Sequence, residues 1–254
     1  MTNGAGNVTV NAYDGLDRLF EVTDPVGRVT RFEYDLAGQQ VREIRAYGTP
    51  LQQDYATYTY SPNGQRLSVT DANANRSSYV YDGFDRLSEL HFPVPALGAN
   101  AASATDYEAY GYDANSNRTS VRLRSGETIA FSYDALNREI LRDLPGAAAN
   151  EVYSAYDLAG RRQSARFASA GGSGIIYAYD SAGRLASETA TLGPSRALIY
   201  QYDTASNRTR ITWPDGVFAQ YTYDALNRVD LECCRFHGHR VKVFKVRSEV
   251  GVCG

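Results

Sequence analysis

Side chains able to perform catalysis are scarce in most of this sequence. Residues 1–230 contain a single histidine, His91, and neither cysteine nor lysine, whereas residues 231–254 hold all three cysteines, both lysines and the other two histidines. Catalysis needs convergent acid, base or nucleophilic groups, and no GxSxG, HExxH or phosphate-binding glycine motif occurs. His91 lies in the strand-like run Leu-His-Phe, which favours a structural histidine. The sequence therefore predicts no catalytic residue and no enzyme activity.

The cysteines and histidines near the end resemble metal ligands by type. Cys233, Cys234, His237 and His239 lie close together, and sulfur and imidazole ligands suit zinc. Adjacent cysteines lack the usual CxxC spacing, however, and no second pair follows. We expect no metal site and no other cofactor.

The most regular chemical feature is a carboxylate that follows a tyrosine. The dipeptide Tyr-Asp occurs nine times, and Tyr60-Ser61 fills the one gap in the series. Calcium sites need a dense supply of oxygen ligands, whereas these carboxylates recur about once in 21 residues. Arginine is frequent in the same motif, so we expect each aspartate to accept hydrogen bonds from a turn and each arginine to neutralise it.

The tyrosines of this series are separated by 21 to 31 residues, which predicts a repeat array. Behind each Tyr-Asp comes a residue that tolerates positive φ and then Arg or Gln, as in YDGLDR (13–18). In YDANSNR (112–118) and YDTASNR (202–208) we expect a turn one residue longer, with Asn117 or Asn207 before the arginine. The structural motif positions are Tyr13, Asp14, Arg18, Tyr34, Asp35, Gly38, Tyr60, Gly64, Tyr81, Asp82, Arg86, Tyr112, Asp113, Arg118, Tyr133, Asp134, Arg138, Tyr156, Asp157, Gly160, Arg161, Tyr179, Asp180, Gly183, Arg184, Tyr202, Asp203, Arg208, Tyr223, Asp224 and Arg228.

The residues around the motif indicate the elements that position it. An aromatic residue recurs two positions before most motif tyrosines, as Phe32, Tyr79 and Tyr177 do, and this spacing is typical of a strand with one aromatic face. Alternation resumes after the turn, so each motif is predicted to be the tip of a β-hairpin, and turns such as Asp24–Gly27 close the units at the opposite edge. We predict an all-β fold of tandem antiparallel hairpins that form a curled, spiralling sheet.

This repeat resembles the Rhs and YD-repeat family, which includes bacterial polymorphic toxins, wall-associated proteins and the animal teneurins. The nine Tyr-Asp dipeptides, most of them followed by Gly, Asn or Asp and then Arg, carry the resemblance. It implies a β-hairpin shell that encloses a C-terminal toxin, with the motif residues as scaffold. The chain is then an arc of such a shell. Its partners are neighbouring repeats and the enclosed toxin, within a secreted or cell-surface protein.

Composition divides the chain into three expected regions. These are a disordered start (1–7), the repeat array (8–230) and a non-repeat tail (231–254) for which a shift of reading frame is one account. The start has no signal-peptide pattern, so we do not expect export of this segment alone. A net charge of −3 gives no basic field for nucleic acid, and no apolar run reaches the roughly 18 residues of a membrane span.

An alternative function is the binding of cell-surface carbohydrate. Exposed tyrosines and turns rich in asparagine and glycine suit sugars through stacking and hydrogen bonding. On this interpretation the tyrosines outside the motif would provide the contacts: Tyr47, Tyr55, Tyr107 and Tyr153.

Overall fold

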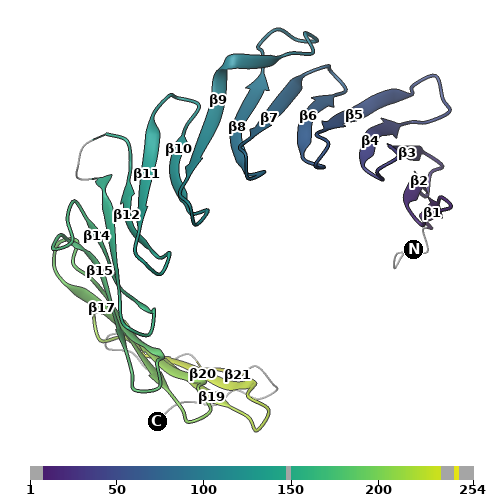
Figure 1. Ribbon diagram of the computed structural model, residues 1–254. Helices are drawn as coiled ribbons and strands as arrows, with labels where there is room; N and C mark the ends of the chain where they lie inside the picture. The colour runs from purple at the N-terminus through teal and green to yellow at the C-terminus, as the bar shows by residue number, and fades with distance from the viewer. Residues whose placement is uncertain (1–7, 147–149, 236–242, 246–254) are drawn as a thin grey trace. The chain divides into compact units, whose positions relative to one another are not determined.

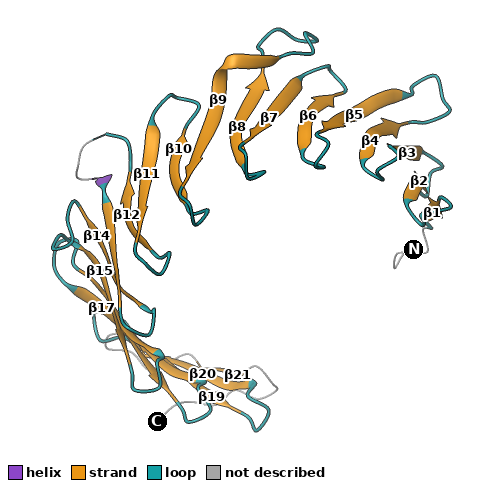
Figure 2. Ribbon diagram, in the orientation of Figure 1, coloured by secondary structure: helices purple, strands orange, loops and turns teal. Residues whose placement is uncertain are grey.

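The computed structural model describes residues 8–146, 150–235 and 243–245. Strands and the turns between them make up almost all of these residues (Figure 2). The chain divides into two compact units, residues 1–129 and 130–254. The predicted disordered start, 1–7, lies outside the described residues. None of the described residues forms a helix with the length and hydropathy of a membrane span.

The first unit is a sheet of ten strands in which every strand pairs antiparallel with the next one along the chain (Figure 1). The strands are β1 (Val10–Tyr13), β2 (Leu19–Thr23), β3 (Val29–Tyr34), β4 (Gln40–Arg45), β5 (Gln53–Tyr60), β6 (Arg66–Asp71), β7 (Arg76–Tyr81), β8 (Leu87–Pro93), β9 (Ala102–Tyr112) and β10 (Arg118–Arg122). Neighbours in sequence are therefore neighbours in space, as in a stack of hairpins.

The second unit repeats this plan with consecutive antiparallel pairs from β11 to β21. Its strands are β11 (Thr128–Tyr133), β12 (Glu139–Asp143), β13 (Val152–Tyr156), β14 (Arg162–Phe167), β15 (Gly174–Tyr179), β16 (Leu185–Ala190), β17 (Arg196–Tyr202), β18 (Arg208–Thr212), β19 (Phe218–Tyr223), β20 (Val229–Arg235) and β21 (Val243–Lys245). The predicted all-β class and the tandem antiparallel hairpins are confirmed. Strand β20 runs through residue 230, where the sequence predicted the end of the array.

Every motif hairpin contains a β-bulge at its tyrosine. In the second hairpin, Tyr34 lies opposite Gln40. The preceding residue, Glu33, lies opposite Arg42, which leaves Val41 as an extra residue. The same shift of register occurs at the other motif tyrosines. A bulge bends its strand and increases the local twist, so a bulge in each hairpin is a physical cause of the curl of each sheet.

The motif turns share one backbone conformation. The amide of Asp14 donates to the carbonyl of Arg18 (2.9 Å), and the amide of Asp17 donates to the carbonyl of Asp14 (3.0 Å). Equivalent pairs close the other motif turns. The fourth residue after each motif tyrosine has positive φ; these residues are Asp17, Gly38, Gly64, Asp85, Ser116, Asn137, Gly160, Gly183, Ser206 and Asn227.

The prediction of a longer turn in two of the hairpins is wrong. In YDANSNR, Ser116 takes the positive φ (66°), and its amide donates to the carbonyl of Asp113, so the turn has the ordinary length. Asn117 therefore holds the position of the motif arginine, and Arg118 is the first residue of β10. The same holds for YDTASNR. Ser206 takes the positive φ, Asn207 holds the arginine position, and Arg208 is the first residue of β18. Because asparagine tolerates positive φ, residue type alone assigned the positive φ to Asn117 and Asn207, one residue after the serines that adopt it.

Few side chains are fully buried in the described part of the chain. Its buried hydrophobic residues are Ile44, Ala56 and Ala219, and most other strand residues are half-buried. A sheet with so small an apolar core depends on its ladder and on contacts between neighbouring strands. The residues of the repeated motif lie at the turn and the bulge of each hairpin, where contacts with the neighbouring hairpin can form.

The turn geometry predicts the effect of substitutions at Gly160. This residue has φ of 79°, and a Cβ added there would meet no other atom within 4 Å. Gly160→Ala should therefore lower the free energy of unfolding by about 1 kcal/mol through backbone strain alone. Gly160→Asn should cost less, because Asn137 and Asn227 already hold this position. Urea unfolding of the full chain measures both, and an equal loss in the two variants would contradict this explanation.

Candidate functional site: the latch between hairpins

The motif aspartate organises its own turn. Asp14 Oδ1 accepts the amides of Leu16 (2.9 Å) and Arg18 (3.0 Å), and its Oδ2 accepts the Arg18 Nε–H (2.8 Å). The same three bonds are made by Asp82, Asp134, Asp180 and Asp224. One carboxylate thus satisfies three donors of a tight turn.

Two variations keep this arrangement without the usual residues. Ser61 stands in for aspartate, and its Oγ accepts the Gln65 amide (3.1 Å). Where asparagine replaces the motif arginine, its amide group takes over the bond: Asn117 Nδ2 donates to Asp113 Oδ2 (2.9 Å). The geometry of the turn therefore persists when the residue types change.

The hydrogen bonds of the turn favour the charged carboxylate. The Arg228 side chain first, and then the amides of Arg228 and Leu226, lower the pKa of Asp224 to about 2. The arginine side chain is also the main reason why the pKa values of Asp14, Asp82 and Asp134 lie below their usual range.

The motif arginine reaches from its own turn to the next hairpin. Arg184 donates to Asp180 Oδ2 (2.7 Å) and, through Nη1, to the carbonyl of Asp203 in the following motif (2.7 Å). Its guanidinium also lies 4.7 Å from the ring centroid of Tyr202. The same bridge joins Arg18 to Tyr34 and Asp35, Arg86 to Tyr112 and Asp113, and Arg138 to Tyr156 and Asp157.

The motif tyrosine makes the return contact. The Tyr179 hydroxyl donates to the carbonyl of Arg162 (2.9 Å), the residue that precedes the bulge of the previous hairpin. Equivalent bonds of 2.7–3.0 Å are donated by Tyr34, Tyr60, Tyr81, Tyr112, Tyr156, Tyr202 and Tyr223. We call the tyrosine–carbonyl bond, together with the arginine bridge where it is present, the inter-hairpin latch.

The latch was not foreseen from the sequence, although a signal for it exists. The motif position holds tyrosine in all ten hairpins, whereas the aromatic position two residues earlier accepts Phe32 and Phe131 as well as tyrosine. The motif position therefore keeps its hydroxyl group in every hairpin, whereas the earlier position does not. The bulge itself has no such signal, because the extra residues include types as different as Val41, Gln163 and Thr119.

The tyrosines proposed for sugar stacking already have partners. Arginine guanidiniums lie over the rings of Tyr47 (4.6 Å), Tyr55 (3.1 Å) and Tyr107 (3.9 Å). Tyr153 donates its hydroxyl to Glu151 Oε2 (2.6 Å). Because one face of three of these rings is covered, they offer less area for stacking on a sugar than the sequence suggested.

Other residues singled out in the sequence have structural positions. The Asp24 carboxylate accepts the amides of Val26 (3.0 Å) and Arg28 (2.9 Å), so its turn repeats the motif geometry at the opposite edge. The backbones of Cys233 and Cys234 pair with β19 as part of β20. His237 and His239 lie outside the described residues. Within the described ranges, no group of three or more His, Cys, Asp or Glu residues is arranged to hold a metal ion.

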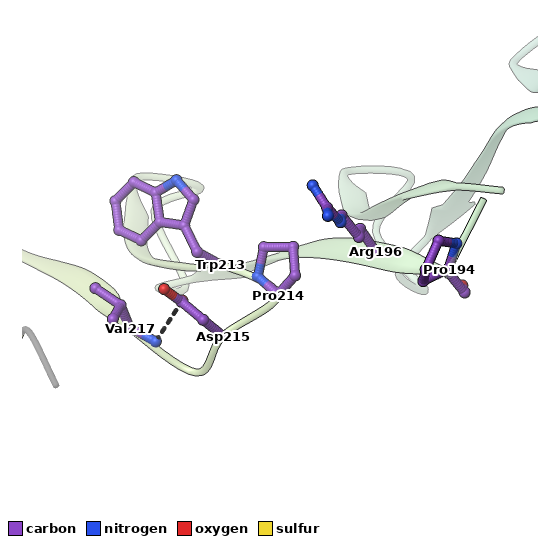
Figure 3. A pocket seen from close by; sticks show the side chains of 7 residues that line it. Pro194, Arg196, Trp213, Pro214, Asp215 and Val217 are labelled. Carbon is purple, nitrogen blue, oxygen red and sulfur yellow. Dashed lines mark hydrogen bonds between the residues drawn. The ribbon is translucent and has the colours of Figure 1, made fainter. Parts of the chain in front are cut away.

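A shallow hollow of about 740 Å³ lies in the second unit between two opposite-edge turns (Figure 3). Its lining residues are Pro194, Ser195, Arg196, Trp213, Pro214, Asp215 and Val217. Asp215 accepts the amide of Val217 (3.0 Å), so its carboxylate serves its own turn.

Comparison with known proteins agrees with this geometry. Residues 13–50 and 57–93 match the RHS repeat, and residues 109–233 match the Teneurin YD-shell. The fold is similar to the crystal structure of TcdB2-TccC3, with a TM-score of 0.69 and 15% identity over 89% of this chain and 13% of that one. It is also similar to the Photorhabdus luminescens Tc holotoxin pore, with a TM-score of 0.68 and 15% identity over 89% of this chain and 12% of that one.

Two relatives are similar in sequence. The double-stranded DNA deaminase toxin A of Burkholderia cenocepacia is 27% identical over 180 residues, which are 66% of this chain and 11% of that protein. The tRNA3(Ser)-specific nuclease WapA of Bacillus spizizenii is 40% identical over 65 residues, which are 26% of this chain and 3% of that protein. The chain thus spans a small part of the length of either relative.

The repeated hairpins and their latch define a tandem antiparallel β-hairpin repeat protein. With the matches to the RHS repeat and the Teneurin YD-shell, the chain belongs to the Rhs/YD-repeat family.

The latch predicts a difference between two tyrosines of one strand. Tyr179→Phe removes the hydrogen bond to the Arg162 carbonyl and should lower the free energy of unfolding by about 1 kcal/mol. Tyr177→Phe is the matched control, because Tyr177 lies two residues away on the same strand and is not in the latch. Chemical denaturation of the full chain compares them, and equal stability of the two variants would exclude a contribution from the hydroxyl bond.

The lowered carboxyl pKa values predict a dependence of stability on pH. A carboxyl group whose pKa is lower in the folded than in the unfolded state stabilises the fold at pH values above its ordinary pKa, here 3.8. This stabilisation is lost as the pH falls towards the folded-state pKa of about 2. Asp224→Asn should therefore make the decline in stability between pH 4 and pH 2 shallower, because the carboxyl group whose pKa is lowered is no longer present. Unfolding curves at several pH values measure this. An unchanged slope would show that Asp224 does not contribute.

Proposed function

We propose that this chain is a structural segment of the wall of an Rhs-type shell, which encloses a C-terminal toxin used against other cells. The observation that carries the proposal is the inter-hairpin latch. Its aspartates, arginines and tyrosines are engaged in holding turns and neighbouring hairpins together, as in Asp180, Arg184 and Tyr202. We assign a scaffold role to the motif positions and no catalytic role to this segment.

The two relatives support this assignment because only a small part of each one aligns with this chain. Their names describe a deaminase toxin and a nuclease, yet the match covers only 11% of the first and 3% of the second. In this proposal the aligned part is repeat shell, and the named activities belong to other parts of those proteins. The partners of this chain are then further repeats and the enclosed toxin, within a secreted or cell-surface protein.

Exposed apolar side chains at the motif turns also fit a segment of a larger wall. Leucine or phenylalanine occupies the tips of several turns in both units, so an apolar side chain recurs along the turn edge of the array. These residues are Leu16, Leu36, Phe84, Leu136, Leu158 and Leu226. We propose that residues 8–230 are the wall-forming array and that its turn edges contact other parts of the shell.

Limited proteolysis of the full-length product of the gene that encodes this chain tests the proposal. The C-terminal domain should resist protease while the shell is intact. Combined Tyr179→Phe, Tyr202→Phe and Tyr223→Phe substitutions should make it several-fold more accessible, since three latch bonds are lost. Tyr177→Phe and Tyr200→Phe together are the control.

Two results would contradict the proposal. One is a C-terminal domain that is cleaved equally fast whether or not the latch is intact. The other is specific binding of the chain to a glycan array, weakened by Tyr47→Ala or Tyr107→Ala, which would favour the carbohydrate-binding alternative.

A further inference from the structure

Strand β9 carries a second irregularity, larger than the motif bulges. His91 on β8 lies opposite Tyr107, but Pro93 lies opposite Ala102. Residues 103–106 of β9 therefore face the single residue Phe92, and they leave the ladder. Large bulges are over-represented beside functional sites and need their own source of stability.

The imidazole of His91 lies against this bulge and bonds through both nitrogens. Its Nδ1 is 2.7 Å from the carbonyl oxygen of Ser103, and its Nε2 is 2.7 Å from Glu89 Oε2. The ring stacks on Tyr107 with centroids 5.1 Å apart. A carbonyl and a carboxylate oxygen both accept hydrogen bonds, so only an imidazole with a proton on each nitrogen satisfies both partners.

Ser103 is the centre of the bulge. It is 8% exposed, and its Oγ accepts the amides of Thr105 (3.2 Å) and Asp106 (2.9 Å). Arg124 holds the far side through its bond to Asp106 (2.8 Å). The bond from His91 to the Ser103 carbonyl ties this local turn to β8, and a buried carbonyl without a donor is costly.

The groups that face His91 are few. On β8 the charged neighbour is Glu89, and the residue opposite on β7 is the uncharged Ser78. On β9 the residue that faces His91 is Tyr107. The guanidinium of Arg122, on β10, lies 3.9 Å from the ring centroid of Tyr107. Burial, the largest influence, lowers the pKa of His91, but the bonds to Glu89 and Ser103 outweigh it and raise the pKa above the ordinary 6.5.

We propose that His91 is a proton-dependent clasp, which holds the bulge at residues 103–106 to β8 when both ring nitrogens are protonated. A neutral imidazole has one N–H, so either the Ser103 carbonyl or the Glu89 carboxylate loses its donor. The hydrogen bond that remains is weaker, because its donor no longer carries a positive charge. The clasp is closed below pH 6.5. It loosens as the pH rises through the titration of His91 in the folded protein, which is the sign expected for a group stabilised in its protonated form.

Nuclear magnetic resonance of the full chain with ¹⁵N-labelled histidine tests the clasp. The His91 signals are identified by their loss in His91→Gln. Both ring nitrogens should be protonated at pH 6, and the midpoint of titration should lie above 6.5. Amide exchange of residues 103–106, corrected for intrinsic rates, should rise about fivefold across that midpoint because a charge-assisted bond is roughly twice as strong as a neutral one.

Two variants separate the clasp from general stability. His91→Gln should remove the pH dependence of exchange at residues 103–106, and Glu89→Gln should move the midpoint down while the fold is retained. A midpoint at or below 6.5, or exchange that stays constant across the midpoint in the unaltered chain, would overturn the proposal.

Discussion

The hydrogen bond from a motif tyrosine to a carbonyl beside the bulge of the previous hairpin is the interaction on which the rest of this structure depends. With Ile44, Ala56 and Ala219 as the buried hydrophobic residues of the described part, each sheet has little apolar core. A bulge bends a strand but disturbs the ladder, and backbone groups near it need partners. The hydroxyl supplies one, as Tyr179 does for Arg162. Curvature and the satisfaction of the backbone are therefore achieved at the same point.

The other motif residues divide the remaining work. Aspartate closes its own turn, while arginine joins that aspartate to the tyrosine ring and the backbone of the next motif. A guanidinium can contact a carboxylate, a carbonyl and an aromatic face together because it is planar and has five donors, which a lysine ammonium cannot reproduce. Because each contact joins adjacent hairpins only, hairpins can be added without limit, as in other repeat proteins.

Much of this arrangement could be predicted from residue types. Tyrosine spacing indicated the hairpins, and glycine, asparagine or aspartate marked the positive φ positions, since few residues adopt this conformation readily. Ser116 and Ser206 were missed because serine is not a usual marker, and the adjacent asparagines were assigned instead. The bulges were missed for a different reason. A bulged residue such as Val41 has no distinctive type, and the register of a hairpin depends on both strands at once. The hydroxyl contact, which depends on the bulge, could not be placed without it.

Site-resolved hydrogen exchange on the full chain tests the central claim most directly, by comparing Tyr156→Phe/Tyr179→Phe/Tyr202→Phe with the unaltered chain. If the hydroxyl bonds hold hairpins to one another, exchange should accelerate in β12–β17 as a block, on both sides of each lost bond. Exchange in β2–β5, far along the sequence, should stay the same. Unchanged exchange across β12–β17 would show that backbone pairing between strands alone holds the hairpins together, and would contradict a stabilising role for the latch.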